Sequence, residues 1–200
     1  MKLLRKLALV VLWGILLCSS VYSQNDKFGI YSNKYLNPNL SFDENVALYI
    51  WENTGKLGEL KDNESMNEEY MRFAFSNKPK NWFGFGYAVI PDGNTVDMKK
   101  YGNGFLYFSI KVVDYLPDTL WVGIKSGSTT AGESWIADLR KYGFIDDKKW
   151  HSIKIPIKDF IDVNRNYFNI AQISQYFMLV GKKILRNGTI DYDEVYWSQY

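Results

Sequence analysis

The chain of 200 residues contains one cysteine, Cys18, and one histidine, His151. A lone cysteine cannot form an intramolecular disulfide, and no Cys/His cluster is present that could hold a structural zinc ion. Every catalytic scheme that pairs a serine or cysteine with a histidine would depend on His151, and the Gly-x-Ser-x-Gly sequence is absent. A glycine-rich phosphate loop before a helix is also missing. These absences argue against the common nucleophilic, zinc-dependent and nucleotide-dependent enzymes.

An excess of charge of either sign is also lacking. The chain has 24 Lys and Arg against 22 Asp and Glu, and three of the basic residues are Lys2, Arg5 and Lys6 at the N-terminus. Without them the balance is 21 basic to 22 acidic residues. A nucleic-acid-binding domain normally carries a basic surplus or stripe, so the composition speaks against one. With 46% hydrophobic and 23% charged residues, the composition is that of a globular domain.

The N-terminus has the pattern of a secretory signal. Three positive charges precede an apolar run over 7–17, and Val21 and Ser23 occupy the −3 and −1 positions of a cleavage site. The run is shorter than the about 20 residues that a membrane-spanning helix needs. A membrane anchor that stays on the mature protein is the alternative.

This pattern predicts a signal peptide over 1–23 and one domain over 24–200. Cys18 follows Leu17 instead of a small residue, which speaks against lipidation. We expect a secreted protein, located in the periplasm, at the cell surface or outside the cell. No later stretch is long and apolar enough to span a membrane.

Short strands dominate the rest of the chain, because apolar and polar side chains alternate with period two. In 105–112, for example, Leu106, Phe108 and Ile110 share one side. Further strand candidates are 120–125, 152–157, 28–32, 46–52, 70–76, 82–90, 174–181 and 189–197. Residues 134–142 fit a short helix and a strand equally well, and 53–69 predicts a long surface loop. About nine strands without crossover helices predict an all-β antiparallel β-sandwich and exclude a parallel α/β fold.

Aromatic residues are abundant, at 34 of 200, which is more than a core of this size needs. Tyr107 and Trp121 occupy strand positions opposite the aliphatic ones, whereas Trp82 and Trp135 fit either the same face or a loop site at the sandwich edge. Flat rings beside charged side chains suit sugars, whose C–H faces stack and whose hydroxyls take hydrogen bonds. For each ring, burial at a sheet edge is the equally favoured alternative. The candidate ligand-binding residues are Arg72, Trp82, Tyr107, Lys111, Trp121, Lys125 and Trp135.

Two carboxylates stand near the C-terminus, at Asp191 and Asp193. On a regular strand they share a face with Val195 and Trp197, which would point them inward. An unpaired buried charge is costly, so an inward carboxylate needs a partner or a cation such as Ca²⁺. Acids that face solvent on an edge strand are the alternative.

Several stretches, in order along nearly the whole mature chain, resemble the jelly-roll carbohydrate-binding modules with a galactose-binding-like β-sandwich that are appended to bacterial β-glucanases. They are Phe28-Gly-Ile-Tyr-Ser32, Tyr49-Ile-Trp-Glu52, Trp82-Phe-Gly-Phe-Gly86, Asp97-Met-x-x-Tyr101-x-x-Gly104-x-Leu106-x-Phe108-x-Ile110-Lys111, Trp150-x-x-Ile153-x-Ile155-Pro156-x-x-x-Phe160 and Ile190-Asp-Tyr-Asp193-Glu-Val195. The resemblance implies a non-catalytic protein that binds a β-glucan-like polysaccharide or oligosaccharide. It also implies a structural Ca²⁺ between the first and last strands, with Asp193 and Glu52 as candidate ligands.

Function argued from fold is analogy, so two other classes stay open. An envelope structural or adhesion protein would use the sandwich for contacts with a protein partner, and would show an apolar patch without a sugar-width groove. A small glycosidase would need two carboxylates about 5–10 Å apart across a cleft.

The leader pattern predicts cleavage after Ser23. Intact-mass measurement of the exported protein should give a chain that begins at Gln24. An exported chain that retains Met1 would contradict this prediction.

The calcium assignment predicts that chelator lowers the melting temperature and that added Ca²⁺ restores it. A ligand bound only by the folded state stabilises it by about 2.7 kcal/mol at a hundredfold excess over Kd. Equal melting midpoints with chelator and with Ca²⁺ would rule the ion out.

Overall fold

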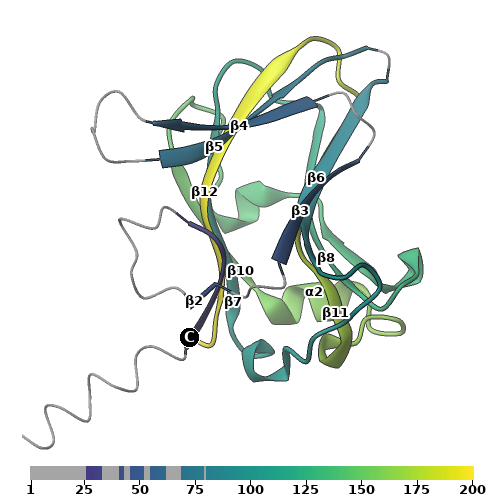
Figure 1. Cartoon of the computed structure of the whole chain (residues 1–200). Helices are drawn as coiled ribbons and strands as arrows, with labels where there is room; N and C mark the ends of the chain where they lie inside the picture. The colour runs from purple at the N-terminus through teal and green to yellow at the C-terminus, as the bar shows by residue number, and fades with distance from the viewer. Residues whose placement is uncertain (1–25, 33–40, 43–45, 52–54, 62–68, 79) are drawn as a thin grey trace, which may run out of the picture.

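The computed structural model of the chain describes residues 26–32, 41–42, 46–51, 55–61, 69–78 and 80–200 (Figure 1). The predicted signal peptide over 1–23 lies outside these residues. In the described part, no helix is long and apolar enough to cross a membrane.

The described strands form two sheets that face each other as a β-sandwich (Figure 1). Sheet A comprises β1 (Lys27–Tyr31), β2 (Ser41–Phe42), β4 (Gly55–Lys61), β5 (Glu69–Phe75), β7 (Phe105–Val112), β10 (His151–Pro156) and β12 (Gly188–Ser198). Sheet B has the order β3-β6-β11-β8-β9, with β3 (Val46–Trp51), β6 (Trp82–Val89), β8 (Thr119–Ser126), β9 (Glu133–Ile136) and β11 (Ile173–Lys182). Apart from the parallel pair β1–β2, neighbouring strands are antiparallel, which confirms the predicted fold class.

The structure corrects two local expectations. The surface loop expected over 53–69 contains β4, which pairs with β5 along its whole length. The ambiguous segment 134–142 divides into the end of β9 and a 3-10 turn, η4 (Leu139–Tyr142). Strand β4 has few β-branched residues, so its conformation depends on its pairing with β5 more than on its own strand propensity.

The described part also contains a short helix, α2 (Ile157–Val163), which follows directly after Pro156.

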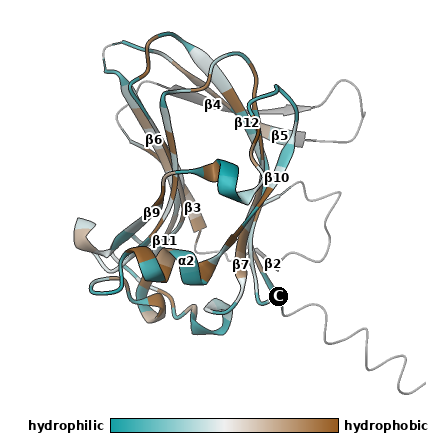
Figure 2. Ribbon diagram, turned by 180° about the vertical axis from the view of Figure 1, so that it is seen from behind, coloured by the Kyte–Doolittle hydropathy of each residue, from teal (hydrophilic) through white to brown (hydrophobic). Residues whose placement is uncertain are grey.

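Aromatic rings from both sheets fill the space between them. The ring centroid of Phe73 in β5 lies 4.8 Å from those of Phe83 and Phe85 in β6, and Phe85 lies 4.9 Å from Tyr192 in β12. These four side chains are fully buried. Brown, hydrophobic segments run along the strands, and teal segments gather in the connections (Figure 2). Much of the aromatic surplus therefore belongs to the core.

Strand β12 contains a bulge that changes which side chains face the core. Glu194 has a φ of 53°, and the register with β7 shifts between Asp193 and Tyr196. As a result, Tyr192 and Val195 are both buried although they are three residues apart. The expectation that the two aspartates share a face with Val195 and Trp197 is therefore wrong, because it assumed a regular strand.

Asp191 is fully buried on the outer side of sheet A and has two cationic partners. Its carboxylate accepts hydrogen bonds from Arg72 Nε at 2.6 Å and Nη2 at 2.8 Å, and Lys111 Nζ lies 3.3 Å away. These three residues stand side by side on β5, β12 and β7. Side-chain cations thus provide the partners that the buried carboxylate requires.

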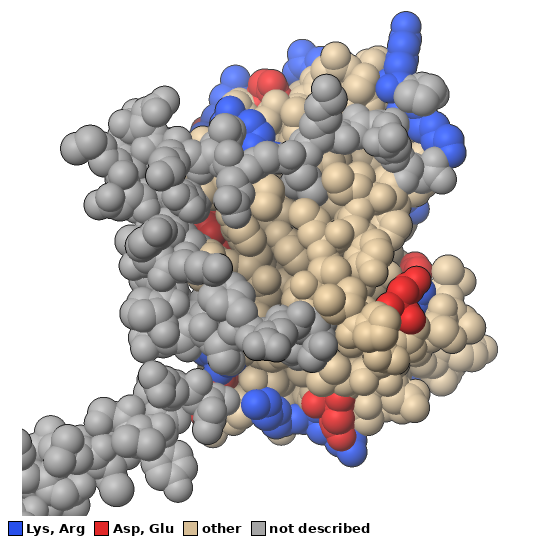
Figure 3. All heavy atoms as spheres, viewed as in Figure 1, with Lys and Arg blue, Asp and Glu red and all other residues tan. Residues whose placement is uncertain are grey.

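Charged side chains lie around the margin of the molecular face seen in Figure 3, and its centre is without them. Basic and acidic groups both occur at that margin. The edge strand β3 also leaves Leu48 and Ile50 38% and 41% exposed.

Candidate functional site

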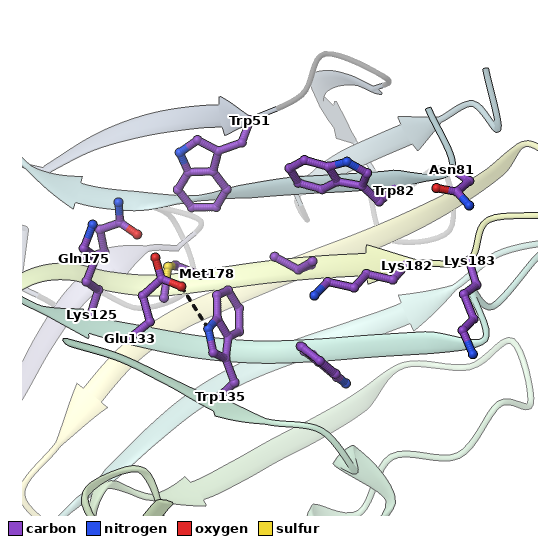
Figure 4. A pocket seen from close by; sticks show the side chains of 12 residues that line it. Trp51, Asn81, Trp82, Lys125, Glu133, Trp135, Gln175, Met178, Lys182 and Lys183 are labelled. Atoms are coloured by element: carbon purple, nitrogen blue, oxygen red, sulfur yellow. Dashed lines mark hydrogen bonds between the residues drawn. The ribbon is translucent and has the colours of Figure 1, made fainter. Parts of the chain in front are cut away.

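The outer face of sheet B is hollowed by an open groove of about 670 Å³ (Figure 4). The chain from Gln24 onward has six tryptophans, and four of them line this groove: Trp51, Trp82, Trp121 and Trp135. Trp197 is buried in the core, where its Nε1 donates to the carbonyl of Tyr176. Most of these tryptophans are therefore concentrated in one groove.

The tryptophans lie on both sides of the central strand β11. Trp51 and Trp82 come from β3 and β6, and Trp121 and Trp135 come from β8 and β9 (Figure 4). The ring centroids of Trp121 and Trp135 are 6.4 Å apart. Met178 and Val180 of β11 line the groove between the two pairs. An elongated, apolar floor with an aromatic wall on each side results.

Strand alternation explains why these rings face outward. In β8, Val122 and Ile124 are fully buried against the core, so Trp121 and Lys125 must project from the other side. In β6, Phe83 is fully buried and the preceding Trp82 is only partly so. The same hydrophobic burial that holds the sandwich together therefore presents the tryptophans to solvent.

Glycines beneath the rings set how deeply the tryptophans lie. A Cβ on Gly123 would stand 2.5 Å from Cε3 of Trp135. A Cβ on Gly84 would stand 2.8 Å from Cε3 of Trp51, and one on Gly86 would stand 2.7 Å from its Cη2. Carbon atoms pack at about 3.5–4.0 Å, so each ring lies where a larger residue would have to displace it. The indoles thus rest against the sheet backbone and leave the groove open.

Polar side chains stand at both ends of the groove (Figure 4). Lys125, Glu133 and Gln175 lie at one end, and Asn81 and Lys183 lie at the other. The Glu133 carboxylate accepts a 3.1 Å hydrogen bond from Trp135 Nε1, which holds that indole in orientation.

Four of the seven candidate residues come together in this groove: Trp82, Trp121, Lys125 and Trp135. The other three, Arg72, Tyr107 and Lys111, lie on the outer face of sheet A, on the opposite side of the sandwich. The candidates therefore cannot form a single platform. For Trp82 and Trp135, the structure selects the sheet face over a loop site.

Contacts within the protein occupy the three candidates on sheet A. Tyr107 stacks on Tyr196 with centroids 4.9 Å apart and an interplanar angle of 14°, and burial raises the pKa of Tyr196 to about 12. Lys111 Nζ lies 5.1 Å from the ring of Trp150 and 5.5 Å from that of Tyr70. Arg72 and Lys111 also pair with Asp191, so each of the three candidates on this face contacts other side chains of the protein.

Trp51, Met178, Val180 and Lys182 were not among the residues expected at a site. Trp51 could have been found, because it alternates with the aliphatic Leu48 and Ile50 just as Trp121 does with Val122. Strand β11 is buried at almost every position. Its sequence therefore carries no signal for which side chains face the groove.

The described groove residues do not provide a hydrolytic pair. Glu133 is the one carboxylate among the described residues that line it. His151 packs on Phe144, with centroids 6.0 Å apart, and its Nε2 lies 2.6 Å from Asp147 Oδ1. That hydrogen bond lowers the pKa of Asp147. His151 is thus held between the Phe144 ring and the Asp147 carboxylate.

Of the two predicted calcium ligands, Asp193 lies among the described residues. Among them, no group of three or more His, Cys, Asp or Glu could hold a metal ion. Asp193 Oδ1 accepts a hydrogen bond from the N–H of Glu194, and the candidate ligand Glu52 lies outside the described residues. Calcium binding remains a prediction that the chelation experiment tests.

Comparison with solved structures places the sandwich among carbohydrate-binding modules. A family 30 carbohydrate-binding module superposes with a TM-score of 0.61 at 16% identity, covering 85% of this chain and 96% of that one. The family 30 module of a cellulosomal cellulase of Clostridium thermocellum gives 0.59 at 16% identity, covering 85% and 95%. An exo-1,3/1,4-β-glucanase from a Pseudoalteromonas species gives 0.56 at 12% identity, covering 87% of this chain and 20% of the enzyme. At these identities the similarity establishes the fold.

Sequence comparison establishes the family. No curated protein matches the chain. The family model of carbohydrate binding domain 30, however, matches residues 19–199, which confirms the resemblance drawn from the strand motifs. Since this match spans almost the entire sequence, the chain belongs to family 30 of the carbohydrate-binding domains.

Proposed function

We propose that this protein is an exported, non-catalytic domain that binds a β-glucan-like polysaccharide in the groove of sheet B. The observation that carries the proposal is the pair of tryptophan walls, Trp51 with Trp82 and Trp121 with Trp135, on either side of β11. Indole faces stack on the C–H faces of sugar rings, and the polar groups at the groove ends can hydrogen-bond hydroxyls. The leader pattern over 1–23 supports export.

The shape of the groove fits a sugar chain better than a protein surface. It extends along β11 from Gln175 to Lys182, about 23 Å at about 3.3 Å per strand residue. A flat apolar patch would favour adhesion to a protein partner, but a groove with aromatic walls favours a linear polymer. The β-glucan preference is supported by similarity to a cellulase module and to an exo-1,3/1,4-β-glucanase.

The affinity should be modest. Stacking of a nucleic-acid base on an aromatic side chain contributes about 1–3 kcal/mol, and we expect a sugar ring to contribute at the lower end of that range. Several such contacts, reduced by the cost of ordering the sugar chain, correspond to a Kd in the micromolar to millimolar range.

Replacing Trp121 by Ala should weaken binding to soluble β-glucan at least about fivefold, because one stacking surface is lost. The melting temperature should change little, since the ring is partly exposed. Retardation in gels that contain polysaccharide measures binding, and thermal melting measures stability.

Tyr107→Ala is the matched control, because Tyr107 is also a partly exposed aromatic side chain on the outer side of a strand. It should retain retardation. Equal loss in both variants would place the site elsewhere. A stability loss of about 3–5 kcal/mol in Trp121→Ala would show that the residue belongs to the core.

Gly123→Ala should weaken β-glucan binding several-fold although no aromatic residue is removed. The new Cβ would stand 2.5 Å from the Trp135 ring, so the indole must move about 1 Å into the groove. Near-ultraviolet circular dichroism should report the altered indole environment, and melting should show a folded protein. Unchanged affinity in the folded variant would mean that the position of Trp135 does not matter for binding.

A further inference from the structure

We propose that the groove selects an acidic polysaccharide, one whose sugar rings carry carboxylate or sulfate groups, over a neutral polymer of the same backbone. This inference rests on the proposed function of the groove. Three lysines line the groove: Lys125, Lys182 and Lys183. Stacking of sugar rings on the tryptophans does not require them.

These lysines give the groove a charge that the rest of the protein does not share. The described lining residues include three lysines and one carboxylate, that of Glu133. The chain from Gln24 onward, in contrast, has 21 basic and 22 acidic residues. Positive charge is therefore concentrated where the ligand would lie, and a groove with low-dielectric walls strengthens its field.

Lys125 does not form the ion pair with Glu133 that its position in the sheet would allow. It stands directly opposite Glu133 in the β8–β9 register, an arrangement that normally forms a cross-strand ion pair. The Glu133 carboxylate is instead hydrogen-bonded to Trp135 Nε1. The ammonium group at this end of the groove thus remains available to an anionic ligand.

Lys182 lies at the stacking surface itself. Its Nζ is 4.2 Å from the centroid of the Trp121 ring, so a charged substituent on a sugar near that ring would come within reach. Within the described part of the chain, no carboxylate lies at salt-bridge distance from Lys125, Lys182 or Lys183.

Some exposed basic residues of the described chain have acidic partners: Lys99 pairs with Asp97, Arg140 with Asp138, and Arg165 with Asp162. Lysines without a salt bridge, such as Lys149 and Lys158, also occur elsewhere on the described surface. The three groove lysines are distinguished by lining one groove together beside a single carboxylate. An acidic polymer would supply the missing anions at the two ends of the groove.

The test compares three polymers of one backbone: a neutral mixed-linked β-glucan, its C6-carboxylated derivative and its sulfated derivative. Calorimetric titration at low salt should give a Kd about tenfold lower for at least one acidic polymer, equivalent to about 1.4 kcal/mol. In 1 M NaCl the preference should vanish, because the Debye length falls to about 3 Å. The two acidic polymers distinguish carboxylate from sulfate as the preferred group.

In Lys125→Gln/Lys182→Gln, the ratio of the Kd for the neutral polymer to the Kd for the acidic polymer should fall to about one, whatever the change in the Kd for the neutral polymer. Lys149→Gln/Lys154→Gln is the matched control, because both residues are exposed at or next to β10 in sheet A and the change in charge is the same. It should keep the preference. Trp121→Ala should weaken binding of all three polymers.

Equal affinity for the neutral and acidic polymers would overturn this inference and leave the proposed function intact. A preference that the control pair also loses, or that Trp121→Ala retains, would place the attraction outside the groove and overturn it as well. Binding to none of the polymers would instead overturn the proposed function.

Discussion

The groove depends on three positions that lack a side chain on the outer face of sheet B. Gly84 and Gly86 lie beneath Trp51, and Gly123 lies beneath Trp135. A Cβ at Gly84 or Gly123 would push an indole outward into the space that a sugar chain would use, and a Cβ at Gly86 would also meet the main-chain oxygen of Phe177. Because the rings lie against the backbone, they form walls beside Met178 and Val180 instead of filling the groove. The groove therefore depends on the absence of side chains at these glycines as well as on the tryptophan rings.

The two outer faces of the sandwich show how similar residues can serve different purposes. On sheet A, Tyr107 stacks on Tyr196, and Arg72 and Lys111 neutralise the buried Asp191. On sheet B, the tryptophans line an open groove and the lysines there have no carboxylate partner among the described residues. The two faces therefore differ in that a groove is open on the outer side of sheet B, whereas the candidate residues of sheet A pack against one another and around a buried carboxylate.

The aromatic richness of the chain has two physical causes. The chain has a single cysteine and cannot form an intramolecular disulfide, and rings such as Phe73, Phe83 and Phe85 bury large apolar areas between the sheets. A second part of the surplus is the set of tryptophans on the outer side of sheet B. Period-two alternation links the two, because each strand that fixes its apolar side in the core also fixes its other side at the surface.

From the sequence alone, alternation determined most strands, the fold class and the outward direction of Trp121, Lys125 and Tyr107, because these depend on neighbours along one strand. Alternation did not determine which strands belong to the same sheet, and so which outward-facing side chains lie on the same face, because sheet order depends on long-range pairing. Alternation therefore grouped Arg72, Tyr107 and Lys111 with residues that lie across the sandwich. The bulge at Glu194 reversed the parity expected for the end of β12. Strand β4 and the groove-facing side of β11 also became clear only in the tertiary structure, because pairing and burial on both faces override the local pattern.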